Sequence, residues 1–174
     1  METDVEFKGL DNLAGKLDMS AHKCVDGIAA ICGKTIREFD KLPLPVTTLE
    51  LSVVFLNDDD IHKINLQYRH IDAPTDVLSF PLWENENGIF DPPSSWHSLP
   101  LGDIMICPNI VANNASDNGK IFEEELILVL FHGFLHLIGF DHDTEEKRNI
   151  MWTVQDKMVQ DYFEKWWNND CRYF

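Results

Sequence analysis

Positive charge is scarce in this sequence. Its 174 residues include 30 Asp and Glu but only 14 Lys and Arg, so the formal net charge is −16. A protein that binds nucleic acid mainly through bulk electrostatic attraction is basic, because it must neutralise phosphates. The composition excludes that mode of binding, so a nucleic-acid role needs a local basic site, a metal ion or a docking partner. The simplest interpretation of the acidity is that it keeps the protein in solution.

Long apolar runs and targeting signals are also missing. The longest apolar stretch, Leu126–Phe140, is interrupted by His132 and His136 and is too short to cross a bilayer. The N-terminal sequence METDVEFKGL carries acidic residues, no arginine, and no basic region followed by an apolar one. We therefore expect neither a secretory signal nor a mitochondrial presequence, and we expect a cytoplasmic protein that does not associate with membranes.

Cysteine is sparse, and its spacing carries no motif. The four cysteines are Cys24, Cys32, Cys107 and Cys171, and none forms a C-x-x-C pair. This spacing indicates neither a zinc ribbon nor a redox motif. We expect reduced thiols, as in cytosolic proteins, with Cys107 in the core.

The length and composition indicate one globular domain. A chain of this length suits a single domain over residues 1–174, and 44% hydrophobic residues can form a core. No internal repeat or low-complexity segment interrupts it. The order of strand-like and helix-like segments predicts an α+β fold with about four strands in one mixed sheet. Helices would pack on this sheet, and the helix that carries the histidines would lie in the core.

Residue patterns give approximate bounds for these elements. Segments rich in β-branched and aromatic residues, or with alternating polarity, predict strands at 4–10, 47–57, 75–81 and 101–107. Caps and apolar spacing predict helices at 21–40 with Ser20 as the N-cap, at 59–69, from Pro108 onward, at 122–139, and after Thr144. Residues 82–100 predict a long surface loop. The last helix is expected to direct Ile150, Met151, Val154, Met158, Phe163 and Trp166 toward the core.

The clearest chemical pattern is FHGFLHLIGFDHD, residues 131–143. His132 and His136 are four residues apart, so on a helix they point the same way and can meet one metal ion. Gly139 permits a turn that returns His142 to the other two. Imidazole is the commonest metal ligand in proteins. We therefore predict a metal site of His132, His136 and His142; the alternative is that these histidines are ordinary core or surface residues.

The predicted ligand set favours a catalytic ion over a structural one. Three protein ligands leave one coordination position open, which is typical of catalytic zinc. Zinc is the expected ion, and three histidines also suit nickel, copper or iron. Asp141 and Asp143 flank His142 and either orient the ligands or form a solvated loop.

The same spacing occurs in the zinc helix of metzincin proteases, H-E-x-x-H-x-x-G-x-x-H, in which the glutamate is the general base. Here that position is Gly133, which cannot transfer a proton. The expected Met-turn is also unconvincing, because Met151 lies inside a predicted helix. Both departures argue against peptide hydrolysis.

Three blocks of the sequence resemble the YbeY family of rRNA-maturation endoribonucleases. HGFLHLIGFDH (132–142) looks like the signature H-G-x-L-H-L-x-G-[YF]-D-H, and INLQYRHIDAPTDVLSFP (64–81) and LGDIMIC (101–107) agree in order. The resemblance covers roughly Leu51 to Asp143. It implies a single-domain α+β fold, a metal held by the three histidines, and single-strand-specific RNA cleavage in small-subunit rRNA maturation and ribosome quality control. It also implies ribosomal proteins or a ribosome-associated GTPase as partners.

The resemblance assigns the family's functional arginine to Arg69, and we place Arg69 and His132 in the catalytic set. The residue pattern supports Arg69 independently. It lies at an expected helix end before a turn, where its guanidinium could reach into a cleft and grip a phosphate bidentately. The alternative is a surface salt bridge. Asp76 and Asp103 are expected to have structural roles.

Three hypotheses follow from the sequence. The first is a metal-dependent endoribonuclease in which Arg69 binds the scissile phosphate. The second is a metal-dependent hydrolase of another class, acting on peptides or small esters, against which Gly133 argues. The third is a non-enzymatic ribosome-assembly factor whose metal is structural. No residue is assignable as the general base.

Overall fold

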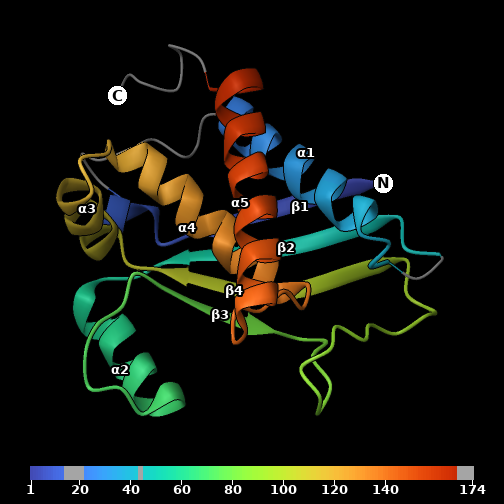
Figure 1. Cartoon of the computed structure of the whole chain (residues 1–174), viewed down its shortest axis with the longest axis horizontal. Coiled ribbons are helices and arrows are strands. Elements are labelled where there is room, and N and C mark those ends of the chain that lie inside the picture. The colour runs from blue at the N-terminus through green and yellow to red at the C-terminus, as the bar shows by residue number, and fades with distance from the viewer. Residues whose placement is uncertain (14–21, 43–44, 168–174) are drawn as a thin grey trace.

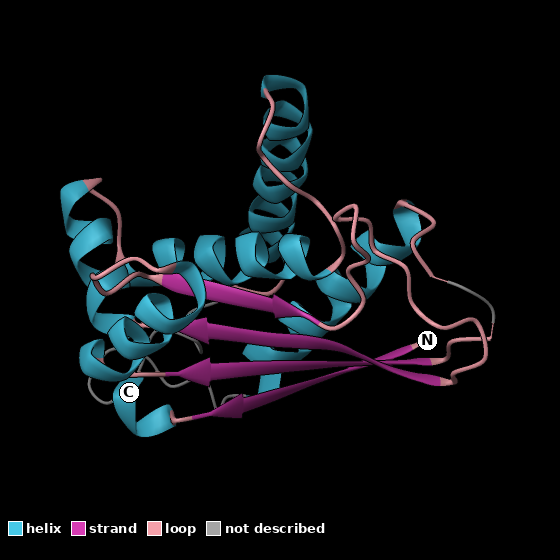
Figure 2. Ribbon diagram, turned by 90° about the horizontal axis from the view of Figure 1, so that it is seen from below, coloured by secondary structure: helices cyan, strands magenta, loops and turns pink. Residues whose placement is uncertain are grey.

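A four-stranded mixed sheet forms the centre of the computed structural model, which describes residues 1–13, 22–42 and 45–167 (Figure 1). The strand order is β1-β2-β4-β3, with β1 at Glu2–Lys8, β2 at Thr48–Phe55, β3 at Val77–Pro81 and β4 at Ser98–Ile106. β1, β2 and β4 run parallel, and β3 runs antiparallel to β4, so in Figure 2 one arrow points against the other three. This arrangement confirms the predicted fold class.

Helices cover the two faces of the sheet unequally. On one face, α1 (His22–Glu38) contacts β1, and α4 (Phe122–Leu137) contacts β3 and β4. α5 (Glu145–Lys165) contacts α4 and α1 and crosses in front of α4 in Figure 1, and α3 (Pro108–Asp117) packs beside α4. A short 3-10 helix, η1 (Leu10–Leu13), follows β1. On the opposite face, α2 (Asp58–Arg69) buries Ile61 against Leu78 and Cys107.

The helix predicted to carry the metal site is the most deeply buried element of the fold. Its buried apolar side chains lie on several sides of the helix axis, which is the pattern of a central helix with neighbours on several sides. They are Leu126, Ile127, Val129, Leu130, Phe131, Phe134, Leu135 and Leu137. This burial confirms the predicted core position of α4. In the part of the chain that the structure describes, no helix combines the length and the apolarity needed to span a membrane.

The structure corrects the predicted loop at 82–100. β4 begins at Ser98, because Leu99 pairs with Leu49 of β2 and both side chains are fully buried. Inside the remaining segment, Glu84 and Phe90 form an antiparallel bridge, and Phe90 is only 8% exposed. The connection is therefore shorter than the composition predicts and is anchored in the core through Phe90.

One side-chain prediction is corrected as well. Ile150 is 47% exposed, because α5 buries the stripe that begins at Met151 and leaves the preceding position in solvent. Phe39 lies beyond the end of α1 and is 39% exposed, with its ring packed edge-on against Phe140.

The buried thiols of Cys32 and Cys107 are free. The predicted N-cap Ser20 and the cysteine at 171 lie outside the described residues.

Gly133 allows α4 to lie close to the sheet. A Cβ atom at this position would be 2.8 Å from Cγ2 of Ile104 and 3.1 Å from Oγ of Ser79. Both partners lie on strands, Ile104 on β4 and Ser79 on β3, and the two residues are paired in the sheet. The methyl Cγ2 is attached directly to the branched Cβ of Ile104 and has little freedom to move away. A side chain at 133 would therefore push the helix off the sheet.

We expect Gly133→Ala to lower the free energy of unfolding by up to about 2 kcal/mol, because overpacking of about 1–3 kcal/mol outweighs the helix-propensity gain of about 1 kcal/mol. In an Ile104→Ala background the same substitution should be neutral or stabilising, since the contacting methyl group is absent. Urea unfolding of the four proteins in this double-mutant cycle measures the coupling. Equal costs in both backgrounds would contradict the contact between Gly133 and Ile104.

Candidate metal centre

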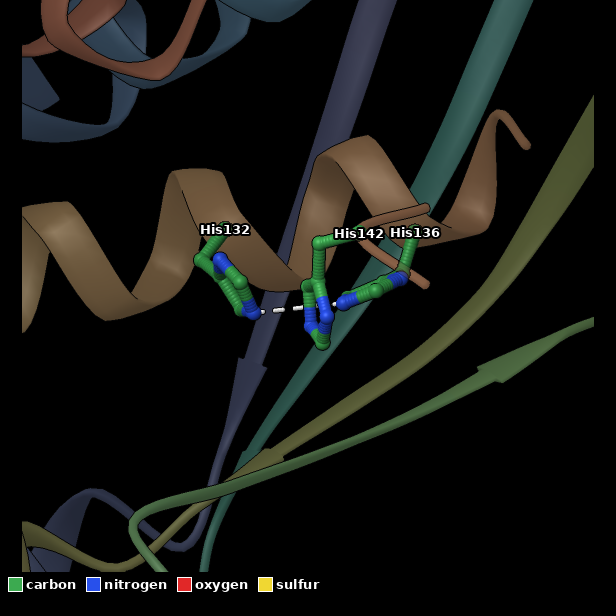
Figure 3. Close-up of side chains that lie close together, drawn as sticks. All are labelled: His132, His136 and His142. Carbon is green, nitrogen blue, oxygen red and sulfur yellow. Dashed lines mark hydrogen bonds between the residues drawn. The ribbon is translucent and has the colours of Figure 1, made fainter. Parts of the chain in front are cut away.

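The three predicted histidines come together at the C-terminal end of α4 (Figure 3). The Nε2 atoms of His132 and His136 are 3.2 Å apart, as expected for residues one helical turn apart on the same face. His142 lies on the segment after the helix, and its ring centroid is 5.5 Å from that of His132 and 5.1 Å from that of His136. One ligand atom from each residue lies within 4.8 Å of the others. The predicted turn back toward the helix is confirmed.

A glycine-terminated helix end produces this return. The Gly139 amide donates to the His136 carbonyl and the Phe140 amide to the Leu135 carbonyl, which is the hydrogen-bond pair of a Schellman motif. Gly139 has φ 79°, as the motif requires. A Cβ there would also lie 2.9 Å from Cβ of Phe90, so the loop that carries Phe90 packs directly on the turn. Two independent constraints thus select glycine at 139.

The acidic residues beside His142 serve the local backbone and the next helix. Oδ1 of Asp141 accepts a hydrogen bond from the His142 amide at 2.7 Å, which fixes the backbone that carries this imidazole. Asp143 instead pairs with Lys147 in the first turn of α5, with 3.0 Å between Nζ and Oδ1. Thr144 caps that helix by accepting from the Lys147 amide, as predicted. Asp141 therefore supports the site through the main chain.

Partial burial keeps the helical histidines neutral. Desolvation lowers the pKa of His132 and, with the nearby His132 and His142 rings, lowers the pKa of His136 to about 4. At neutral pH the imidazoles of His132 and His136 therefore carry no proton that a metal would have to displace. The cluster is prepared to bind a cation, in agreement with its chemistry as a donor set.

Sequence inspection missed one residue of the centre. Oε1 of Gln155 lies 2.9 Å from Nδ1 of His132, and Gln155 is only 6% exposed. The residue lies on α5, whose neighbouring buried positions are Met151, Val154 and Met158. A polar residue within this apolar stripe was the available signal, but its partner on α4 follows only from the tertiary fold.

Arg69 and two of the three histidines, His136 and His142, line a common cavity of about 330 Å³. His136 and His142 contribute to one side, and Arg69 enters from the C-terminal end of α2, where His70 adopts a left-handed conformation with φ 59°. Ser79 and Glu84 also line this space. In the described part of the chain Arg69 forms no salt bridge, so its guanidinium is available to a ligand.

Two other acidic residues named from the sequence lie outside this cavity lining. Oδ1 of Asp76 accepts from the Val77 amide and Oδ2 from the Asn114 side chain, so this carboxylate joins the start of β3 to α3. Asp103 lines a separate, open hollow of about 530 Å³ over the other face of the sheet. That hollow also contains Asp4, Glu6 and Glu50. It is an acidic surface rather than part of the histidine centre.

The position at which metzincins carry their general base points into the sheet in this protein. Gly133 faces Ile104 and Ser79, whereas the rings of His132 and His136 point toward each other and toward His142 beside this contact. A glutamate at 133 would meet the same contacts as any side chain there. The structure thus gives the missing glutamate a packing reason, and the arrangement offers three imidazoles and a guanidinium that together can bind a divalent cation and an anionic group.

Known proteins are similar to this chain in sequence and in fold. The sequence model of a family described as Endoribonuclease YbeY matches residues 14–163, a wider range than the three similar blocks. An endoribonuclease YbeY from Lacticaseibacillus paracasei is 38% identical over 159 residues, which cover 91% of this chain and 97% of the relative. The Shouchella clausii protein of the same name is 47% identical over 118 residues, covering 65% and 72%. A Thermotoga maritima protein solved in solution has a TM-score of 0.59 and 26% identity, covering 98% and 96%.

The lowered pKa of His136 predicts a pH-dependent stability for the metal-free protein. Between about pH 6.5 and pH 4 the unfolded chain binds a proton at His136 that the folded chain does not, so the free energy of unfolding falls as the pH is lowered. The loss should be on the order of 2–3 kcal/mol. Urea unfolding of wild type and His136→Gln from pH 8 to pH 4 measures it. The difference between the two proteins should change across this window, and a constant difference would contradict the expectation.

Proposed function

The chain belongs to the YbeY family of metal-dependent endoribonucleases, and from this premise we propose that it cleaves single-stranded RNA during small-subunit rRNA maturation and ribosome quality control. The observation that supports the proposal most directly is the cavity that Arg69 shares with His136 and His142 of the histidine cluster. It combines a cation-binding donor set with a group that binds phosphate. Together these two elements can stabilise the negative charge that develops when a phosphodiester is cleaved.

The donor set fits one divalent cation, with Zn²⁺ as the expected ion. His132, His136 and His142 would be its ligands, and their candidate ligand atoms already lie within 4.8 Å of one another. Gln155 engages Nδ1 of His132 and leaves Nε2 for the cation. When bound, such an ion supplies Lewis-acid chemistry at a phosphodiester. His132 would thus take part in catalysis as a ligand.

Arg69 would bind the scissile phosphate. A guanidinium donates two parallel hydrogen bonds to phosphate oxygens, which orients the substrate as well as attracting it. The same donors would stabilise the negative charge that develops on the phosphoryl group in the transition state. The absence of a salt bridge at Arg69 among the described residues supports this role over the alternative of a surface ion pair.

The distribution of charge on the protein indicates how the enzyme would be brought to its RNA substrate. A net charge of −16 repels RNA at long range, and the acidic hollow lined by Asp4, Glu6, Glu50 and Asp103 would attract basic proteins instead. We infer that ribosomal proteins or a ribosome-associated GTPase bring the enzyme to rRNA in the cytoplasm. The local positive charge of Arg69 would then act only at short range.

Arg69→Ala should lower kcat/KM for cleavage of a single-stranded RNA by about 10²–10³-fold, the usual effect of removing one charge-stabilising donor. Its zinc content should be unchanged. His132→Ala should lose both zinc and activity. Cleavage assays on single-stranded and duplex RNA, run beside elemental analysis, measure both quantities.

Arg148→Ala is the matched control, because Arg148 is exposed on α5 and packs over Trp152 rather than lining the cavity. It should cleave like wild type. A folded Arg69→Ala, His132→Ala double variant that supports normal ribosome assembly would show a non-enzymatic role instead. A peptide-cleaving activity lost in His136→Ala would indicate a hydrolase of another class.

Binding to arbitrary RNA at physiological salt should be weak, with a Kd in or above the range of about 10⁻⁶–10⁻⁴ M seen for non-specific complexes. The physical reason is the acidic surface, which offers few phosphate contacts. Filter binding with RNAs of unrelated sequence measures the affinity. Nanomolar binding by the isolated protein would remove the need for a docking partner.

A further inference from the structure

Gln155 reaches the histidine cluster from a different helix. It lies on the buried face of α5, only 6% exposed, and its Oε1 is 2.9 Å from Nδ1 of His132 on α4. A buried amide costs free energy unless it is hydrogen-bonded. Its buried neighbours on α5, including Met151, Val154 and Met158, are apolar. Packing alone therefore does not require an amide at this position.

The hydrogen bond decides which ring nitrogen of His132 carries the proton. An amide oxygen only accepts, so Nδ1 of His132 must donate. In the neutral ring the proton is then on Nδ1, and Nε2 keeps its lone pair. That lone pair lies on the side of His136, whose Nε2 is 3.2 Å away, and so faces the cluster. Gln155 thus presents the atom of His132 that a cation would bind.

The neutrality of Gln155 has its own consequence. A carboxylate in the same place would accept the same hydrogen bond, but it would make the ligating imidazole more basic and add a negative charge beside the site. Acidic residues are abundant in this chain, and Asp156 follows directly. An amide preserves the attraction of a bound cation for an anionic group, whereas a carboxylate would reduce it.

We propose that Gln155 is a positioning residue that holds His132 in its Nδ1–H form and, because it is neutral, preserves the full charge of the bound cation for the phosphodiester. This inference rests on the proposed function, since it takes the three histidines as the ligands of a divalent cation. It adds a residue of α5 to a centre that otherwise comes from α2, α4 and the loops beside them.

The test compares Gln155→Leu with Gln155→Glu in the full chain. After chelation, each protein is titrated with Zn²⁺ against a chromophoric chelator, and the visible spectrum is recorded with Co²⁺. Loss of the hydrogen bond in Gln155→Leu should weaken Zn²⁺ binding by about 10–100-fold. Gln155→Glu should bind Zn²⁺ at least as tightly as wild type, yet cleave RNA about 10-fold or more slowly at saturating Zn²⁺.

Gln160 provides the matched control, because it is exposed on the same helix and bonds to Glu164. Gln160→Leu and Gln160→Glu should match wild type in both measurements. A folded Gln155→Leu protein with wild-type Zn²⁺ affinity would overturn the proposal. If that variant does not fold, Gln155→Glu decides alone, since it keeps the shape and the hydrogen bond; unchanged cleavage would then be the contradicting result.

His132→Ala separates this inference from the proposed function. If His132→Ala still binds Zn²⁺ like wild type, the metal site itself is wrong and the proposed function fails with it. If His132→Ala loses Zn²⁺ while both Gln155 variants behave as wild type, only the role of Gln155 fails.

Discussion

The contact between α4 and the sheet at Gly133 determines the position of the histidine centre. Because no side chain intervenes, the helix approaches Ile104 of β4 and Ser79 of β3 closely. His132, one residue earlier, and His136, three residues later, project from the helix beside this contact, and His136 lines the cavity next to β3. Ser79 itself lines the cavity, so the strand that supports the helix also forms part of the cavity lining.

The other parts of the centre are arranged around this buried helix. The Schellman turn at Gly139 returns His142, and Phe90 packs on that turn and connects it to the loop after β3. α5 lies across α4 and brings Gln155 to His132. α2, on the opposite face of the sheet, ends at Arg69 beside the same cavity. The centre is therefore assembled from separate parts of the chain around a buried helix.

Local chemistry explains which features were predictable from the sequence. The spacing of His132 and His136 and the glycine at 139 express helix periodicity and backbone conformation, both properties of a few consecutive residues. Contacts between residues that are far apart in the sequence could not be predicted from such local patterns. The early start of β4 depends on pairing Leu99 with Leu49, and the exposure of Ile150 depends on how α5 lies over α4. Gln155 was missed for the same reason, and Arg69 was named through a family resemblance joined to its place at a helix end.

The position of β3 has a consequence for how the protein behaves in solution at high concentration. β3 is an edge strand of five residues that ends in Pro81, and β1 at the other edge carries a charged residue at every second position, namely Glu2, Asp4, Glu6 and Lys8. Short edges, proline and charge all oppose strand addition from another molecule. Neither edge of the open sheet therefore favours pairing with a strand of another molecule. These edges oppose aggregation through an intermolecular β-sheet.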